Sequence, residues 1–235
     1  MGEINSAVVA AQCVAFIESQ RNVKGRYVQA VLCNYPADSE GIINSVNGAV
    51  IDGVTVTPTE FTAWVAGATA GAAANKSNTA RIVDGATEII GELDDDGIVD
   101  ALKNGKFLLS QLRDGRVKVE QDINSFISFT GEKNYIFGKN RVVRVLDEIG
   151  SNVRDIWERS YMGKVNNDAN GREMFRGDII SYLTEMQRIG ALREFSGADD
   201  VTVSLGDRLD AVLAKLKVKP ADAMEYLYMT VDVQA

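Results

Sequence analysis

The chain has 235 residues, of which 46% are hydrophobic and 25% charged, and its net charge is −8. This composition is typical of a soluble globular protein with one large or two smaller domains. The acidic balance argues against general binding to nucleic acid or to anionic membranes. The absence of histidine excludes Ser-His-Asp and Cys-His catalysis, and zinc sites that need imidazole. Cys13 and Cys33 lie in apolar runs, so we expect two buried, reduced thiols.

The first half of the chain predicts alternating helices and strands. Residues 5–20 predict a helix that is apolar on most sides, which is typical of a helix enclosed in a core. Residues 27–33 predict a buried strand of a parallel sheet, and a second strand is expected near residues 42–50. No apolar run reaches the roughly 18 residues that a membrane-spanning helix needs. We therefore expect an α/β layer and no membrane span.

The next helix carries its own start signal. Thr57, Pro58 and Glu60 predict an N-cap, a proline at the first helical position and a capping box. The helix then buries residues at helical spacing, namely Phe61, Trp64, Val65, Ala68 and Ala72, and the glycines at 67 and 71 leave a thin side that can approach another backbone closely. The alternative for residues 71–77 is a phosphate loop, but the second glycine of that motif is missing and a helix carboxyl end disfavours phosphate.

Acidic residues offer two possible chemistries, and neither is well supported. Asp94, Asp95 and Asp96 could bind a metal, but the helical pattern after them favours a solvated acidic first turn. The pairs Asp94/Asp96 and Glu120/Asp122 could serve in acid–base chemistry, yet nothing in the sequence brings them into a pocket. We therefore predict no catalytic residue, no cofactor and no metal.

The pattern changes near residue 120. Before it, residues 107–112 and 116–119 flank Asp114-Gly115 and predict a hairpin. After it, residues 123–129 predict a connecting strand, and two long helices follow over 140–161 and up to Gly190. Three strands are expected at 201–203, 212–218 and 224–233. We predict two domains, an α/β part over 1–120 and a compact α+β part over 121–235 with two long helices and a small sheet.

The last predicted strand ends close to the chain terminus. Its alternation puts apolar residues on one face and mostly aromatic or polar residues on the other. Such a strand is an open edge unless something covers it. It could pair with residues 212–218 of its own domain, or it could add to a sheet of a neighbouring subunit through main-chain hydrogen bonds.

The order of several short motifs resembles a known family. These motifs are Ala37-Asp38-Ser39-Glu40-Gly41-Ile42-Ile43-Asn44, Phe61-Thr62-Ala63-Trp64-Val65-Ala66-Gly67, Glu120-Gln121-Asp122-Ile123-Asn124, the run 139–147 (KNRVVRVLD), the run 161–167 (YMGKVNN) and the run 220–231 (PADAMEYLYMTV). Together they are similar to the tail sheath proteins of contractile-tailed bacteriophages and related phage-tail-like particles. The resemblance covers nearly the whole chain. Because sheath proteins of this family are longer, we expect the chain to be a carboxyl-terminal portion of one.

The resemblance implies a structural role without catalysis. Residues 1–120 would be the carboxyl-terminal part of a subtilisin-like α/β sheath domain, and residues 121–235 the sheath carboxyl-terminal domain with its terminal arm. The subunit would polymerise around an inner tail tube and contract to drive that tube through a cell envelope. Its partners would be other sheath subunits in a helical homo-oligomer, the tube protein, and baseplate and tail terminator proteins. Its place would be the virion tail sheath, assembled in the cytoplasm of a bacterial host.

Two sets of residues are expected to make these contacts. The intersubunit strand would be formed by Met224, Tyr226, Leu227, Tyr228, Met229, Val231 and Val233. The tube-facing candidates are four bases near the ends of the long helices, Lys139, Arg141, Lys164 and Arg172, which could equally be ordinary solvated side chains. The alternative function is a soluble α/β adaptor or nucleotide-binding protein that does not polymerise.

Overall fold

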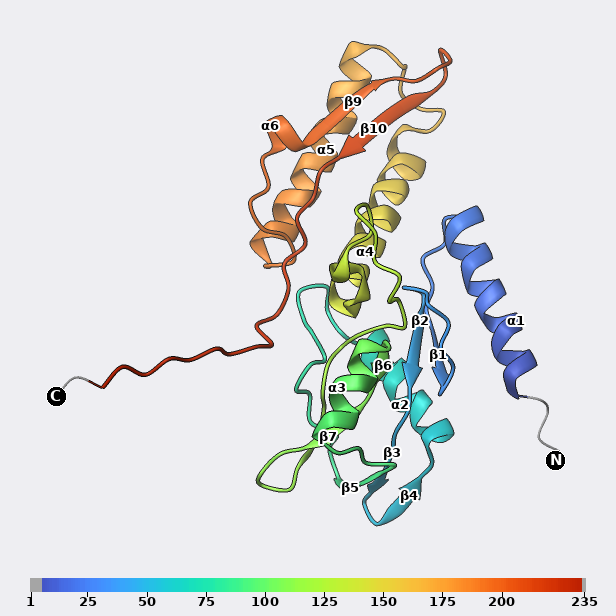
Figure 1. Ribbon diagram of the computed structural model, residues 1–235. Coiled ribbons are helices and arrows are strands. Elements are labelled where there is room, and N and C mark those ends of the chain that lie inside the picture. The colour runs from blue at the N-terminus through green and yellow to red at the C-terminus, as the bar shows by residue number, and fades with distance from the viewer. Residues whose placement is uncertain (1–5, 234–235) are drawn as a thin grey trace.

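The computed structural model describes residues 6–233 and is drawn as a ribbon in Figure 1. Two hydrophobic cores organise the chain. The first, called the sheet core, is built around Ile43, Phe61, Val65, Phe107 and Val117. The second, called the helix core, is built around Val145, Phe175, Ile179, Leu183 and Val201. The predicted mixture of α/β and α+β elements is therefore present in coarse outline, with small sheets and several helices. Within the described residues, no helix is long and apolar enough to cross a membrane.

Two three-stranded sheets and the predicted hairpin surround the sheet core. The strands β1 (Ala30–Cys33), β2 (Ile42–Ser45) and β6 (Lys106–Phe107) form a parallel sheet in the order β1-β2-β6. The strands β4 (Val54–Val56), β3 (Gly48–Ile51) and β5 (Ala86–Ile90) form an antiparallel sheet. The predicted strand at 27–33 is confirmed over its second half.

The single strand expected near residues 42–50 is instead two strands in different sheets. The chain turns at Asn47, whose buried side chain binds two other segments. Its Nδ2 donates to the Gly91 carbonyl at 2.5 Å, and its Oδ1 accepts from the Leu109 amide at 3.0 Å. A buried amide that satisfies backbone groups on both sides makes the turn a fixed part of the core.

The capped helix is confirmed. Helix α2 (Pro58–Ala70) begins after Thr57, whose Oγ1 accepts from the Glu60 amide, while the Glu60 carboxylate accepts from the Thr57 amide at 2.9 Å. It buries Phe61, Val65 and Ala68, whereas Ala72 lies beyond its end. No other described residue approaches within 4 Å of a Cβ built at Gly67, so its thin side is open.

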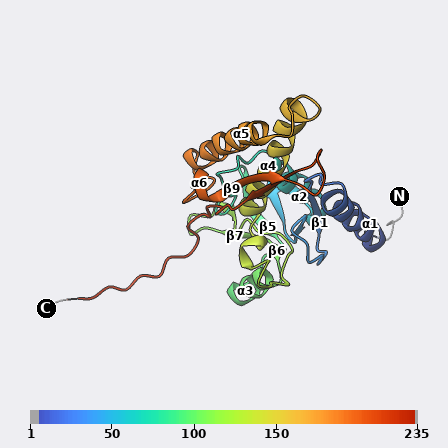
Figure 2. The ribbon, with the colours of Figure 1, turned by 90° about the horizontal axis from the view of Figure 1, so that it is seen from above.

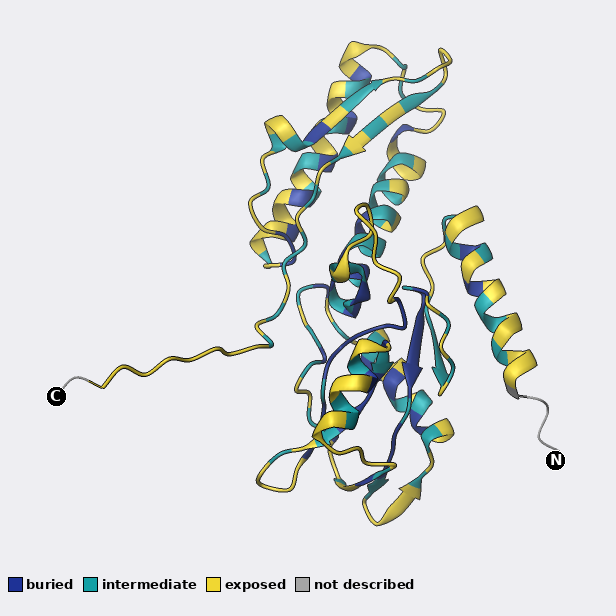
Figure 3. Cartoon of the chain, in the orientation of Figure 1, coloured by how far each residue is buried: buried dark blue, intermediate teal, exposed yellow. Residues whose placement is uncertain are grey.

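The first helix exists, but its predicted environment is wrong. Helix α1 (Ser6–Glu18) continues into the π-helix η1 (Ser19–Val23), and Asn5, the first residue of the prediction, lies outside the described residues. Along α1 only Ile17 is buried among the described side chains, and Val8, Val9 and Phe16 are exposed (Figure 3). The apolar sequence of this segment predicts an enclosed helix, whereas α1 lies against one side of the molecule (Figure 1). Cys13, on α1, and Cys33 are free thiols that are half-buried rather than buried.

The predicted hairpin is confirmed. Strands β7 (Leu109–Gln111) and β8 (Val117–Val119) pair antiparallel around the Asp114-Gly115 turn. Helix α3 (Asp95–Lys103) precedes them, with Asp94 as its N-cap, which confirms the acidic first turn. Residues 123–129 do not form the expected strand, because their amides bind separate segments: Asn124 donates to Gly138, and Ser125 donates to Ile42.

The two long helices are confirmed. Helix α4 (Asn140–Ile156) continues as the π-helix η3 (Trp157–Tyr161), after the short 3-10 helix η2 (Tyr135–Gly138). Helix α5 (Ala169–Arg188) ends just before Gly190, which takes a positive φ of 77°. After the short helix α6 (Gly197–Asp200), the strands β9 (Val201–Leu205) and β10 (Val212–Leu216) form an antiparallel pair whose apolar residues join the helix core.

The last predicted strand has no partner within residues 6–233. Beyond Ala223 the chain is extended and leaves the body, which Figures 1 and 2 show from two directions. Strand β10 pairs with β9 rather than with residues 224–233. The intramolecular alternative is therefore wrong in this structure, because no backbone hydrogen bond joins the segment to residues 212–218.

Candidate functional site

The terminal arm, defined as residues 224–233, is the most exposed apolar segment that the structure describes. Its exposed residues are Met224, Tyr226, Leu227, Tyr228, Met229, Val231 and Val233, with exposures between 67% and 102%. None of the arm's amides from 224 onward donates to another described residue. Apolar side chains and unpaired amides along one extended segment are the features of a strand that lacks its sheet.

The root of the arm is held by side chains of its own body. The Glu225 carboxylate accepts from Thr79 Oγ1 at 2.7 Å and pairs with Lys139 Nζ. Gln121 Nε2 donates to the hydroxyl of Tyr226. Only 4% of the Glu225 side chain is exposed. The arm therefore leaves the molecule from a defined point.

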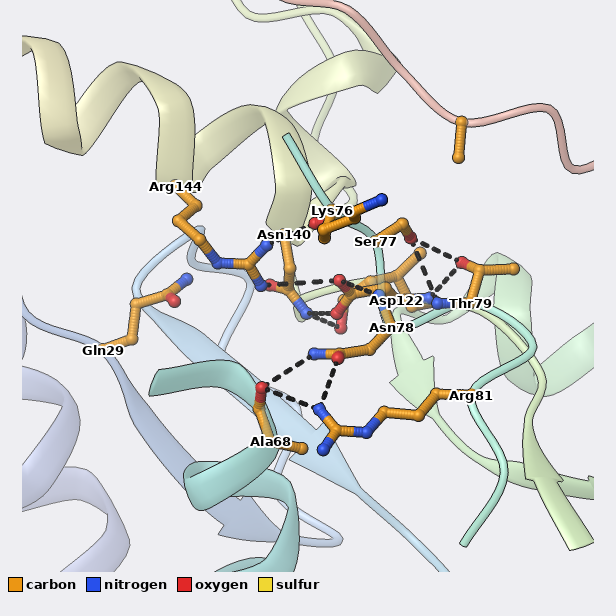
Figure 4. A network of polar contacts seen from close by, with 12 residues as sticks. Gln29, Ala68, Lys76, Ser77, Asn78, Thr79, Arg81, Asp122, Asn140 and Arg144 are labelled. Atoms are coloured by element: carbon orange, nitrogen blue, oxygen red, sulfur yellow. Dashed lines mark hydrogen bonds and ion pairs between the residues drawn. The ribbon is translucent and has the colours of Figure 1, made fainter. Parts of the chain in front are cut away.

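Behind this root lies a polar network centred on Asp122 (Figure 4). The Asp122 side chain is fully buried, and its carboxylate accepts from the Asn78 amide and from Asn140 Nδ2, each at 2.9 Å. Arg144 Nη2 lies 3.5 Å from the same carboxylate. One buried charge thus has three compensating partners from two distant segments, which offsets the desolvation of its carboxylate.

The same network reaches both halves of the chain. Asn78 Nδ2 and Arg81 Nη1 both donate to the Ala68 carbonyl at the end of α2 (Figure 4). On the other side, Arg144 Nη1 donates to the Lys76 carbonyl at 2.8 Å. The segment 71–77, considered above as a phosphate loop, is thus a connection bound to α4 through its own backbone. We define these contacts, centred on Asp122, as the junction.

A second set of contacts fixes η1 to α4. Arg21 makes two hydrogen bonds to Asp147, at 2.7 and 2.8 Å, and its guanidinium lies over the Tyr27 ring. Arg154 Nη1 donates to the Gly25 carbonyl at 2.7 Å. A bidentate pair fixes the relative orientation of two elements as well as their distance. Beside it lies a cavity of about 510 Å³ between β1, α2 and α4.

The four predicted tube-facing bases do not gather in one place. Lys139 is paired with Glu225, and Arg141 Nη2 donates to the Gly190 carbonyl at 3.1 Å. Lys164 is exposed and donates to the Arg159 carbonyl, and Arg172 binds the carbonyl and the side chain of Asn167 at 3.0 Å. They form two groups, one at the start of α4 and one around the start of α5, and their role in tube contact stays a prediction.

The sequence did not single out Glu225, Thr79 or the central role of Asp122. Glu120 and Asp122 were considered as an acid pair, but Glu120 binds Ser110 and Lys118, whereas Asp122 faces the junction. Burial raises the pKa of Glu120, but the hydrogen bonds from Lys118 and Ser110, together with the positive charge of Lys118, bring that pKa below its ordinary value. A usable signal was present in the arm, where Glu225 is the one charged residue between Ala223 and Val231. No group of three or more acidic or cysteine side chains in the described chain is arranged to hold a metal.

Comparison with known proteins identifies the family of the chain. The "Phage tail sheath protein central domain" matches residues 2–125, and the "Phage tail sheath C-terminal domain" matches residues 132–234. The chain is 40% identical over 231 residues to "Phage-like element PBSX protein XkdK" of Bacillus subtilis, covering 95% of this chain and 50% of that protein. The chain spans about half the length of the curated relatives it matches.

Solved structures agree with the family match. The crystal structure of the sheath tail protein from Desulfitobacterium hafniense superimposes with a TM-score of 0.87 at 39% identity, covering 97% of this chain and 54% of that one. The helical sheath of the anti-feeding prophage in its contracted state shares the fold, with a TM-score of 0.71 at 13% identity, over 94% of this chain and 66% of that one. The two family matches, which together span most of the sequence, show that the chain belongs to the phage tail sheath protein family.

Proposed function

We propose that the chain is part of a structural subunit of a contractile tail sheath, which polymerises around an inner tail tube and contracts to drive it through a cell envelope. Membership of the sheath family supports this function, and the shared fold with a sheath solved in its contracted state is consistent with it. The family is a structural one, and we propose that the subunit carries out no catalysis. Its place would be the tail sheath of a phage or prophage particle, assembled in the bacterial cytoplasm.

The terminal arm is the observation that carries this proposal. Residues 224–233 expose a row of apolar side chains and a row of unpaired amides on one extended segment. Adding this segment to the sheet of a neighbouring subunit would satisfy the amides and bury alternate side chains. Several backbone hydrogen bonds acting together would also keep subunits linked while their bodies reorient during contraction.

The alternation of the arm sets which residues each side would present. One side carries Leu227, Met229, Val231 and Val233, and the other carries Tyr226, Tyr228, Thr230 and Asp232. In a strand, successive side chains point to opposite faces. We propose that the aliphatic side packs on the neighbour's core and that the side with Tyr228, Thr230 and Asp232 faces outward.

The decisive experiment removes residues 227–235 in the gene that encodes the chain and examines the particles by electron microscopy. We expect free tubes and unpolymerised sheath protein, because the exchanged strand is lost while its root stays in place. A sharper variant is Met229→Pro, which removes one main-chain donor from the arm, with Asp232→Asn as the matched surface control. Normal sheaths from the shortened chain would refute the exchange.

Contacts with other parts of the particle are proposed on the same family basis. The partners would be the tube protein, the baseplate and the tail terminator, with Lys139, Arg141, Lys164 and Arg172 facing the tube. Exposed ion pairs contribute about 0–1 kcal/mol each, so a set of them can hold the tube and still release it. Reversing the charge of Lys164 and Arg172 tests one group and reversing Arg141 tests the other, while Lys139 is left unchanged because it also pairs with Glu225. Unchanged co-assembly of sheath and tube would dismiss the groups tested.

The two cores support the domain organisation that we propose. Residues 1–120 would be the end of a subtilisin-like α/β sheath domain, and the parallel strands β1, β2 and β6 with α2 beside them are consistent with it. Residues 121–235 would be the sheath carboxyl-terminal domain with its arm. The sheet core and the helix core fall on either side of this boundary, apart from Ala74, which reaches into the helix core.

A further inference from the structure

Glu225 is buried in a segment that is otherwise exposed. Its side chain is 4% exposed, whereas Met224 before it is fully exposed and Leu227 shortly after it is 84% exposed. Burying a carboxylate is unfavourable unless charged and hydrogen-bonding partners compensate it. The chain supplies both kinds of partner at this one position of the arm.

The partners come from the rigid part of the molecule. Lys139, whose side chain is 12% exposed, immediately precedes α4 and pairs with the carboxylate. Thr79 Oγ1 donates to Glu225 Oε1 and itself accepts from the Asp122 amide at 2.9 Å. The carboxylate is therefore joined to the junction through a single hydroxyl group. Gln121, next to Asp122, adds the hydrogen bond to Tyr226.

We propose that Glu225 anchors the terminal arm to its own subunit and fixes the point and direction from which the arm leaves. Only the residues beyond Tyr226 are then free to reach another subunit. The described residues 227–233 span about 23 Å when fully extended. For these residues to pair, an acceptor strand in a neighbouring subunit must begin within that distance of the anchor.

The anchor is released without leaving a buried charge behind. The described residues after Tyr226 are exposed and do not hold Glu225 in place, so a detached arm carries the carboxylate into water, and Lys139 becomes exposed to water at the same time. The substitution Glu225→Gln should therefore free the root of the arm while the two cores stay folded. The substitution thus separates the positioning role of Glu225 from a role in overall stability. The proposed anchor depends on the proposed function only for what the arm binds.

Limited proteolysis of the complete chain tests the anchor. Chymotrypsin needs several extended residues around the bond that it cleaves, so an anchored root protects the bond after Tyr226. We expect Glu225→Gln to accelerate this cleavage about tenfold, with an unchanged thermal midpoint. Asp232→Asn is the matched control, since it makes the same change in charge farther along the arm and should leave the rate unaltered.

Two further measurements make the outcome decisive. A synthetic peptide of residues 220–233, with and without the Gln substitution, corrects for the preference of the protease itself. Exchanging the charges in Glu225→Lys combined with Lys139→Glu should restore protection that Glu225→Lys alone removes. Equal corrected rates for the wild type and Glu225→Gln, or no restoration by the exchange, would overturn the anchor. Because these assays use the isolated chain, their result is independent of whether shortened sheaths assemble.

Discussion

At the residue scale, Gly150 shows how one missing side chain lets two elements meet. It lies in the middle of α4, where alanine would normally stabilise a helix. A Cβ built at this position would lie 2.6 Å from Tyr27 Cε2. The absence of a side chain therefore makes room for the Tyr27 ring, which in turn lies under the Arg21 guanidinium.

We expect Gly150→Ala to lower the free energy of unfolding by about 1–3 kcal/mol, because the clash with Tyr27 outweighs the gain in helix propensity. Gly177→Ala is the matched control: it lies inside α5, and nothing approaches within 4 Å of a Cβ built there. That change should raise the free energy of unfolding by about 0.5–1 kcal/mol. Urea unfolding of both variants measures the difference, and equal gains would contradict the close approach of Tyr27.

The ionisation of the Tyr161 hydroxyl reports on the helix core. Burial, together with the hydrogen bond and the negative charge of Asp178, raises the pKa of Tyr161 from 10.0 to about 12. Its hydroxyl donates to Asp178 Oδ2 at 2.6 Å. Because the pKa is raised in the folded state, the stabilising contribution is complete below about pH 10 and is lost as the pH rises through about 12.

Asp178→Asn tests the cause of this shift. Removing the negative charge should lower the pKa of Tyr161 toward its ordinary value while burial keeps it somewhat raised. The pKa of Tyr182, raised to about 12 by burial and by the charge of Glu148, should stay unchanged and serves as the internal control. An ultraviolet titration of tyrosine ionisation follows both groups. An unaltered titration curve in Asp178→Asn would mean that the carboxylate does not act on Tyr161.

At the element scale, α1 shows that a sequence pattern can predict a helix without predicting how deeply that helix is buried. The apolar run predicts a helix correctly, because local periodicity and propensity act within the segment. It cannot reveal how much of that helix the rest of the chain covers. The capping box before α2 was predictable in detail for the same local reason, since its hydrogen bonds lie within four residues.

The candidate site was less accessible to sequence analysis. The arm was recognisable as a strand without a fixed partner, because alternation is a local property. Its anchor joins Glu225 to Thr79 and Lys139, which are 146 and 86 residues away along the chain. The strand predicted at residues 123–129 is absent for a similar reason: the amides of Asn124 and Ser125 bind two distant segments, at Gly138 and Ile42, rather than one neighbouring strand. Contacts of this kind follow only from the folded arrangement.

A pair of substitutions tests how α1 is held. Ile17 is 4% exposed and lies where a Cβ at Gly41 would be 2.7 Å from its Cγ2, whereas its neighbour Phe16 is 59% exposed. We expect Ile17→Ala to lower the free energy of unfolding by about 2–4 kcal/mol and Phe16→Ala to change it by less than about 0.5 kcal/mol. Unfolding at several protein concentrations gives both values. A large effect of Phe16→Ala would mean that another surface covers this face of α1.

At the scale of the whole molecule, we expect the junction to decide whether the two cores unfold together. Asp122 accepts from Asn78 of one half and from Asn140 of the other, and Arg144 of α4 lies beside the same carboxylate. The buried charge thus couples the segment after α2 to the start of α4. Without such coupling, each half could open independently.

Asp122→Ala removes this coupling and leaves polar partners without their acceptor. We expect it to lower the free energy of unfolding by about 3–5 kcal/mol. The exposed Asp207, in the turn between β9 and β10, is the control, and Asp207→Ala should change the free energy by less than about 0.5 kcal/mol.

The two tryptophans make the loss of coupling visible core by core, because Trp64 packs against the sheet core and Trp157 against the helix core. In Trp64→Phe and Trp157→Phe backgrounds, fluorescence reports each core separately. With Asp122 intact the two unfolding midpoints should coincide, as cooperative unfolding requires. With Asp122→Ala they should separate. Coincident midpoints in both cases would mean that packing across the boundary, rather than the buried carboxylate, holds the halves together.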